Sequence, residues 1–210
     1  MRFHLVYSGS LRGSGNSRKP EEVCRIRREL SGQIKHLWQT HNALKVLARE
    51  GARKTGTAMV VAPQGIIPAP REMALNGHSL YEDLCYEIAI GEKRYLPLVR
   101  ESLSLSCELK VLFLRQADPG ALISQGGDID NRIKLLLDAL RMPDKDEQDR
   151  YPPEEDMLYC LMESDHLVSR LDVDTDRLLF PKTEKPDEVH LVIGVRLNVL
   201  QVAPHNMCLL

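Results

Sequence analysis

The centre of the chain carries the stretch Gly127-Asp128-Ile129-Asp130-Asn131-Arg132-Ile133-Lys134-Leu135-Leu136-Leu137-Asp138-Ala139-Leu140. Asp130, Lys134 and Asp138 recur every fourth residue, which places them on one face of a helix. The apolar residues at positions 133, 136, 137 and 140 fall on another face and form a stripe suited to burial. The stretch therefore predicts an amphipathic helix that begins near Asp128 and ends near the Arg141-Met142-Pro143 segment.

The start of this helix also has the composition of a metal site. Asp128 and Asp130 are two residues apart, so in an extended turn both carboxylates point to one face. Carboxylates beside a cation such as Lys134 can hold a hard metal ion next to a phosphate. The alternative is structural: Asp128 or Asp130 caps the helix, and Lys134 pairs with Asp130 or Asp138 on its surface.

The segments around the helix read mostly as strands. Alternating apolar residues predict strands near residues 2–8, 103–114 and 189–200, and shorter strands near 58–62, 84–90, 158–162 and 167–173. Strands on both sides of one central helix predict an α+β fold, with a small, mostly antiparallel sheet and the helix packed on it.

The chain length of 210 residues suits one domain with elaborations. Residues 11–80 are expected to form an N-terminal basic helical and loop region, with helical patterns from Pro20 to Leu30 and from Ile34 to Ala48. Residues 143–157 are acidic and contain prolines, which predicts a solvated loop inserted after the central helix.

The net charge of −2 hides an uneven distribution. Residues 1–55 carry twelve Lys or Arg and four acids, a balance of +8, whereas residues 144–188 carry six bases and fifteen acids, a balance of −9. A basic region is typical of proteins that contact a polyanion, and the candidates for phosphate contacts are Arg12, Arg18, Lys19, Arg25, Arg27 and Arg28. The alternative is a solvated helix face with no partner.

Five cysteines are scattered without a C-x-x-C spacing. The first residues are too short and too polar for the apolar core of a signal peptide, and no apolar run approaches the length of a membrane span. We therefore expect reduced thiols and a cytoplasmic protein.

The motif Asp128-Ile129-Asp130-Asn131-Arg132-Ile133-Lys134, followed by Asp138-Ala139-Leu140, resembles the signature of RusA-like Holliday junction resolvases. In that family a D-x-D-N-x-x-K motif opens a helix that continues to D-A-L, and a second acidic site precedes a strand. Ser164-Asp165-His166-Leu167-Val168 is the best counterpart of the second site, with Ser164 in place of a companion acid. The resemblance covers roughly residues 103–200.

The resemblance implies a homodimeric endonuclease that depends on Mg²⁺, with Mn²⁺ as a possible substitute, and that nicks four-way or branched DNA. It implies that Asp128, Asp130 and Asp165 bind the metal and that Lys134 lies near the scissile phosphate.

Two other functions remain open. The fold could act without cutting, as a module that recognises nucleic-acid structure or as an assembly subunit with a protein partner at the acidic insert. The third possibility is an enzyme that acts on small phosphorylated substrates.

Overall fold

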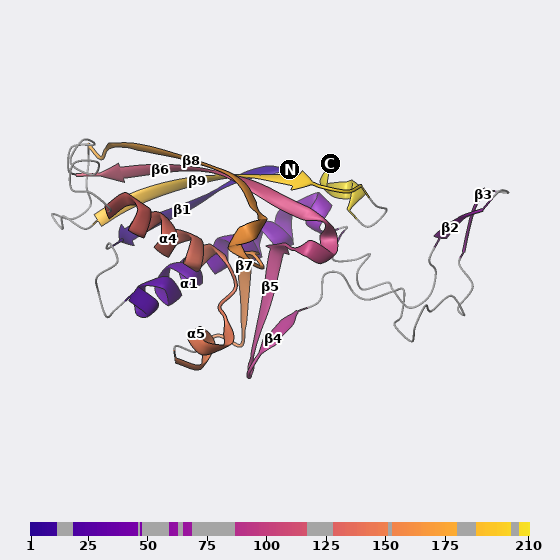
Figure 1. Ribbon diagram of the computed structural model, residues 1–210, viewed down its shortest axis with the longest axis horizontal. Coiled ribbons are helices and arrows are strands. Elements are labelled where there is room, and N and C mark those ends of the chain that lie inside the picture. The colour runs from indigo at the N-terminus through magenta and orange to yellow at the C-terminus, as the bar shows by residue number, and fades with distance from the viewer. Residues whose placement is uncertain are drawn as a thin grey trace.

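The computed structural model describes residues 1–11, 19–45, 47, 59–62, 65–68, 87–116, 128–150, 153–179, 188–202 and 206–210. The protein belongs to the α+β class, as expected, because helices pack on mixed sheets (Figure 1). The main sheet has the strand order β1-β9-β6-β8. Its strands are β1 (Arg2–Ser10), β9 (Glu188–Val199), β6 (Leu105–Arg115) and β8 (Val168–Arg177).

The pairing in the main sheet is mostly antiparallel. β9 runs antiparallel to both β1 and β6, whereas β8 runs parallel to β6 at one edge. The predicted alternation is confirmed in β6 and β9, where every second residue is buried. Period-two patterns produce this result because successive side chains of a strand point to opposite faces of the sheet.

The other strands of the described residues form two smaller sheets. One has the order β4-β5-β7, formed by β4 (Ile88–Ile90), β5 (Lys93–Val99) and β7 (Met157–Met162). The other is a hairpin of β2 (Met59–Ala62) and β3 (Gly65–Pro68). The strand predicted near residues 84–90 is confirmed from Ile88 onward, and residues 84–86 lie outside the described residues.

The helices are α1 (Lys19–Thr40), α4 (Asp128–Leu140) and α5 (Lys145–Arg150), with 3₁₀ turns η2 (Glu101–Leu103), η3 (Asp165–Leu167) and η4 (Met207–Leu209). The first predicted N-terminal helical pattern and the start of the second join in α1, which ends at Thr40, and residues 42–45 are helical after it. The prediction of a plain loop over 143–157 was wrong, because α5 occupies part of that segment. No helix among the described residues is both long and apolar enough to cross a membrane.

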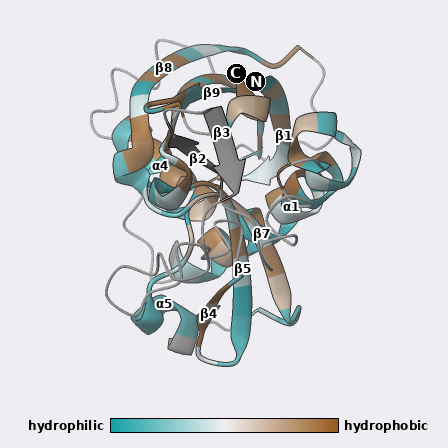
Figure 2. Cartoon of the chain, turned by 90° about the vertical axis from the view of Figure 1, so that its right-hand side faces the viewer, coloured by the Kyte–Doolittle hydropathy of each residue, from teal (hydrophilic) through white to brown (hydrophobic). Residues whose placement is uncertain are grey.

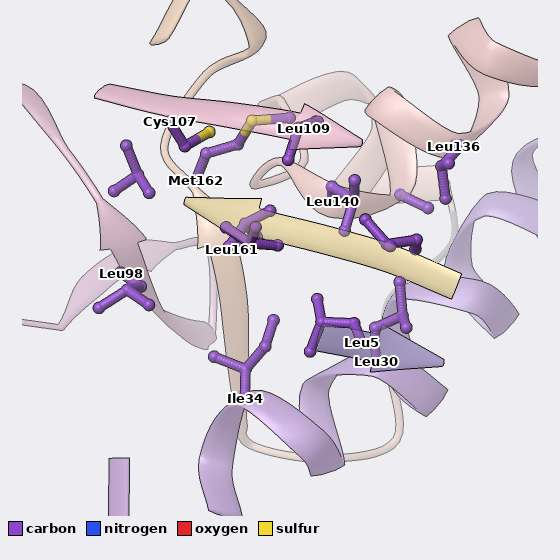
Figure 3. Close-up of a cluster of buried hydrophobic side chains, with 14 of the residues drawn as sticks. Leu5, Leu30, Ile34, Leu98, Cys107, Leu109, Leu136, Leu140, Leu161 and Met162 are labelled. Carbon is purple, nitrogen blue, oxygen red and sulfur yellow. The ribbon is translucent and has the colours of Figure 1, made fainter. Parts of the chain in front are cut away.

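α1 and α4 lie side by side beneath one face of the main sheet (Figure 2). Their apolar faces and the inner face of the sheet form one buried cluster, which includes Leu5, Leu30, Leu109, Leu136 and Leu140 (Figure 3). Leu98, Leu161 and Met162 from β5 and β7 belong to the same cluster. This shared core fixes where α4 lies relative to the strands.

β5 was not predicted from the sequence. Residues 95–99 are all buried, so the strand has no polar alternation, and Pro97 lies inside it. Proline lacks the N–H that a strand ladder needs and argues against a central strand. The segment forms a strand because it pairs in parallel with β7, a partner about 60 residues away, which local pattern cannot reveal.

Candidate active site

The first turns of α4 lie at the end of the main sheet where several elements stop. Ser10 at the end of β1 pairs with Glu188, and Arg115 at the end of β6 pairs with both Arg177 and Val189, so these residues share one end of the sheet. The guanidinium of Arg132 donates a hydrogen bond to the carbonyl oxygen of Leu11, directly after β1, which ties α4 to this end. Figure 1 shows the same gathering at the left of the molecule.

α4 forms as predicted, from Asp128 to Leu140. Its buried face is made by Leu135, Leu136, Ala139 and Leu140, and Ile133 and Leu137 are partly buried beside them. The buried face is therefore rotated slightly from the predicted stripe toward Leu135 and Ala139. The opposite face carries Asp130 and Lys134, which are both exposed.

Asp130 and Lys134 are not used by the fold. Within the part of the chain that the structure describes, neither side chain has a hydrogen bond or an ion pair. Asp138, the other expected partner of Lys134, is paired instead with Arg141 at 3.4 Å. The ion pairs of Lys134 with Asp130 or Asp138, which a purely structural role of the motif predicts, are thus not formed. Asp130 and Lys134 both face solvent at the start of α4.

Asp128 is the first residue of α4, and only its backbone is described. The helix N-terminus favours negative charge, because its first N–H groups have no partner within the helix. Asp128 and Asp130 are both helical, so the extended turn in which their carboxylates were expected to point to one face is not formed.

Arg132 is a residue of this region that sequence reasoning missed. It occupies a variable position of the motif, yet it is 6% exposed and holds the Leu11 carbonyl. Leu11 directly follows β1, so Arg132 ties the end of β1 to α4. A buried arginine one residue after an asparagine has no periodic signal, so only the fold reveals it.

The end of β1 is held by Tyr7 and Arg25. The Tyr7 hydroxyl donates to the Ser10 carbonyl at 2.8 Å, and Arg25 donates to the Tyr7 hydroxyl and to the Ser10 carbonyl. Burial raises the pKa of Tyr7 to about 12, so the hydroxyl stays protonated at neutral pH. Gly9 permits this arrangement, because a Cβ at this position would lie 2.6 Å from the Tyr7 oxygen.

The predicted phosphate contacts have different fates. Arg27, which was predicted to contact phosphate, is 4% exposed and donates hydrogen bonds to the carbonyl oxygens of Asp138 and Arg141. Arg28 is exposed but pairs with Glu155 at 3.0 Å, whereas Arg25 lies at the sheet end that carries Asp130. Lys19 is the first residue of α1, and its side chain is not described. Arg12 and Arg18 lie outside the described residues.

Asp165 is not at this end of the molecule. It opens η3, just before the start of β8, whereas α4 begins near the opposite end of β8. Arg141, which follows α4, forms a bridge with Met162, so Asp165 lies near the last turn of α4. The 13 residues of α4 span about 20 Å. Within one chain, therefore, Asp165 does not converge with the residues at the start of α4.

The turn around Asp165 has its own hydrogen bonds. His166 Nε2 lies 2.7 Å from Glu101 Oε1, and His166 Nδ1 lies 2.8 Å from Ser164 Oγ. Ser164 also donates to Asp165 at 3.4 Å. These exposed contacts tie η3 to η2.

The described side chains offer only part of a metal site. Among them, no group of three or more His, Cys, Asp or Glu is arranged to hold a metal ion. Mg²⁺ requires fewer protein ligands than that, because it binds through one or two carboxylates and keeps several waters and substrate phosphates. At the start of α4, Asp130 is an exposed carboxylate that can belong to such a donor set, and Asp128 precedes it by two residues.

Comparison of the chain with models of protein families, with curated proteins and with solved structures gives no match in any of the three.

Proposed function

We propose that the protein is a metal-dependent endonuclease that nicks four-way or branched DNA, with its site at the start of α4. The observation that supports this proposal is the exposed pair Asp130 and Lys134, whose charges have no partner among the described residues. Charged groups on a helix face usually gain by pairing at this spacing, so an unpaired aspartate and lysine in one motif favour a ligand. The D-x-D-N-x-x-K resemblance supplies the reaction.

Each residue has a distinct role in the proposed reaction. Asp128 and Asp130 would hold Mg²⁺, which lowers the pKa of bound water and neutralises charge that develops on the phosphate. Lys134 lies one turn after Asp130 and offsets negative charge on the phosphate oxygens. Asn131, in the turn between them, can orient the attacking water or the backbone of the DNA.

The DNA would reach the site from the end of the molecule where β1, β6 and α4 meet. Arg25 lies at this end, where it donates to the Ser10 carbonyl, and it would contact the phosphate backbone of the DNA. Such contacts with the phosphate backbone give affinity without sequence preference. Arg27 takes no part, because it is buried.

The test is cleavage of a labelled four-way junction, with a linear duplex as control, in Mg²⁺ and in EDTA. Asp130→Asn and Lys134→Ala should each lower the cleavage rate at least about a hundredfold while junction binding remains. Asp146→Asn is the matched control, since Asp146 is an exposed helical aspartate in α5 with no described contact, and it should leave the rate unchanged. Unchanged cutting by Asp130→Asn would remove Asp130 from the proposed metal site.

The distance between Asp165 and the start of α4 favours a second candidate function, a module that binds junctions without cutting. Tight binding with no cleavage in Mg²⁺ or Mn²⁺ would support it. Asp165→Asn separates the two ideas further: the single-chain site predicts a normal rate, and a large loss would mean that a second copy supplies Asp165.

A further inference from the structure

A hollow lies beside the start of β6, at the end of the main sheet opposite the candidate site. Leu105 pairs there with Val199, so β6 begins where β9 ends, near the two chain termini (Figure 1). The hollow has a volume of about 550 Å³, which is within the range of sites for small ligands. Its described lining comes from η2, η3, the first residues of β6 and β8, and the chain directly after β9. Segments far apart in the sequence thus build one concave surface.

The hydroxyl of Ser106 in this lining has no hydrogen-bond partner among the described residues. Ser106 follows the buried Leu105 in β6, so its side chain points to the face of the sheet opposite the helices. It is nevertheless only 5% exposed. Buried polar groups almost always have a partner, so an unpaired hydroxyl in a hollow favours a polar ligand that supplies one.

The other polar groups of the lining are mainly hydrogen-bond acceptors. The Ser169 hydroxyl donates to the Cys107 carbonyl oxygen at 3.1 Å, so its oxygen can only accept a further bond. Glu101 Oε1 lies 2.7 Å from His166 Nε2, and an ionised carboxylate has no hydrogen to donate. These acceptors favour a ligand that brings its own N–H donors.

The charges around the hollow are negative. Glu101 and His166 are the ionisable side chains of its described lining, which includes no Lys or Arg. Two more carboxylates flank it: Glu163 accepts from the Glu101 N–H at 3.4 Å, and Asp165 directly precedes His166. Even a protonated His166 would leave this region with a net negative charge.

The bases nearby on the outer face of the sheet are already paired. Glu108 is the next residue of β6 on the same face as Ser106, and the registers place Arg170 and Arg196 beside it. Arg170 pairs with Asp172 at 3.0 Å, and Arg196 pairs with Glu108 at 3.7 Å. The carboxylates at the hollow therefore repel phosphate and nucleic acid, and they attract a cation.

Leu200 gives the hollow an apolar wall. It is 68% exposed directly after β9, and its N–H donates to the Ser104 carbonyl oxygen at 2.8 Å. Ser104 has a φ of 52°, a left-handed conformation that a residue other than glycine keeps only when its surroundings hold it. The wall is thus tied to the rest of the lining, and an aliphatic chain can lie against it.

We propose that the hollow binds a linear aliphatic amine with two or more ammonium groups. One ammonium group binds the Glu101 carboxylate and the hydroxyl oxygens of Ser106 and Ser169, and the carbon chain lies along Leu200. A second ammonium group is required because three carboxylates surround the hollow and a single positive charge does not balance them. The hollow lies away from the start of α4, so the proposal does not depend on nuclease activity.

Calorimetric titration of the full chain at low ionic strength tests the class of ligand. Putrescine and spermidine should both bind. Butylamine has the carbon chain of putrescine with one ammonium group, and it should bind about tenfold more weakly or less, because it lacks one charged hydrogen bond. Inorganic phosphate should not bind at this hollow. No binding of either polyamine, or equal affinity for butylamine and putrescine, overturns the proposal.

Three variants test the place of binding. Glu101→Gln should raise the dissociation constant of spermidine about tenfold, and Ser106→Ala should raise it about fivefold without lowering the melting temperature. Glu92→Gln is the matched control and should leave the constant unchanged, because Glu92 is exposed in the turn between β4 and β5 without a contact to a described residue. An equal loss in Glu92→Gln would mean that spermidine binds acidic surface in general. That result, or unchanged binding by Glu101→Gln and Ser106→Ala, overturns the proposal.

Discussion

Arg27 and Arg28 are neighbours in the sequence, but the fold gives them different surroundings. The Arg27 side chain is 5% exposed, and it lies 2.7 Å from Glu147 without the alignment of a hydrogen bond. It also donates to the carbonyl oxygens of Asp138, in the last turn of α4, and of Arg141, which follows the helix. The Arg28 side chain is 42% exposed and has one ion pair, to Glu155. The first arginine is thus part of the interior and the second part of the surface.

The two positions should differ sharply in stability. Arg27→Met should lower the free energy of unfolding by about 3–5 kcal/mol, because it leaves Glu147 and two carbonyl oxygens without their buried partner. Arg28→Met should cost about 0–1 kcal/mol, since an exposed ion pair contributes little. Urea unfolding of both variants measures the difference. Equal losses would contradict the distinct roles given to these arginines.

β1 is an edge strand, and one side chain of α1 covers part of its open edge. The Val6 N–H donates to Gln33 Oε1 at 2.9 Å, and Gln33 Nε2 donates to the Val6 carbonyl at 2.6 Å. The amide of Gln33 therefore takes the place of a neighbouring strand at that residue. Edge strands with free N–H and C=O groups invite pairing with other chains, and such a contact blocks it.

Removal of this amide should expose the β1 edge. Gln33→Ala should cost about 1 kcal/mol of stability and should speed hydrogen exchange at the Val6 amide. Gln39→Ala on the same helix is the control, because Gln39 is exposed and has no hydrogen bond with a described residue. Exchange at Val6 measured by NMR decides the question, and equal rates in the two variants would contradict the role of Gln33.

At the scale of the whole molecule, the two chain ends meet beside the main sheet (Figure 1). The Met1 amino group donates to the Leu209 carbonyl at 3.3 Å, and burial lowers the pKa of that amino group. Leu209 is 1% exposed, and the buried Asn206 donates to the carbonyl oxygens of Leu103 and Gln201. η4 therefore closes the core at the end opposite the candidate site.

Deletion of residues 207–210 should lower the free energy of unfolding by about 2–3 kcal/mol, because it removes the buried Leu209 side chain. Deletion of Leu210 alone should have little effect, since that residue is 73% exposed. Thermal unfolding of the two truncated chains tests this difference. Junction cleavage should survive the longer deletion below its melting temperature, because the candidate site lies at the other end of the sheet.

The α+β class, the strands β6 and β9 and the extent of α4 could be predicted from local pattern. Alternation with period two and recurrence with period 3.6 are written into consecutive residues, and burial of the apolar set enforces them. The exposure of Asp130 and Lys134 also follows from local pattern, because both residues lie on the helical face opposite the leucines.

Other features were decided only by the tertiary structure. β5 depends on its parallel partner β7, the burial of Arg27 and Arg132 depends on contacts with distant carbonyl groups, and the separation of Asp165 from Asp130 depends on the direction of α4 against β8. The sequence by itself determined which residues can form a helix face or a strand face, because these faces are set by neighbours a few positions apart. Long-range pairing decided which faces and charges come together, because packing, and not local geometry, fixes the distances between elements.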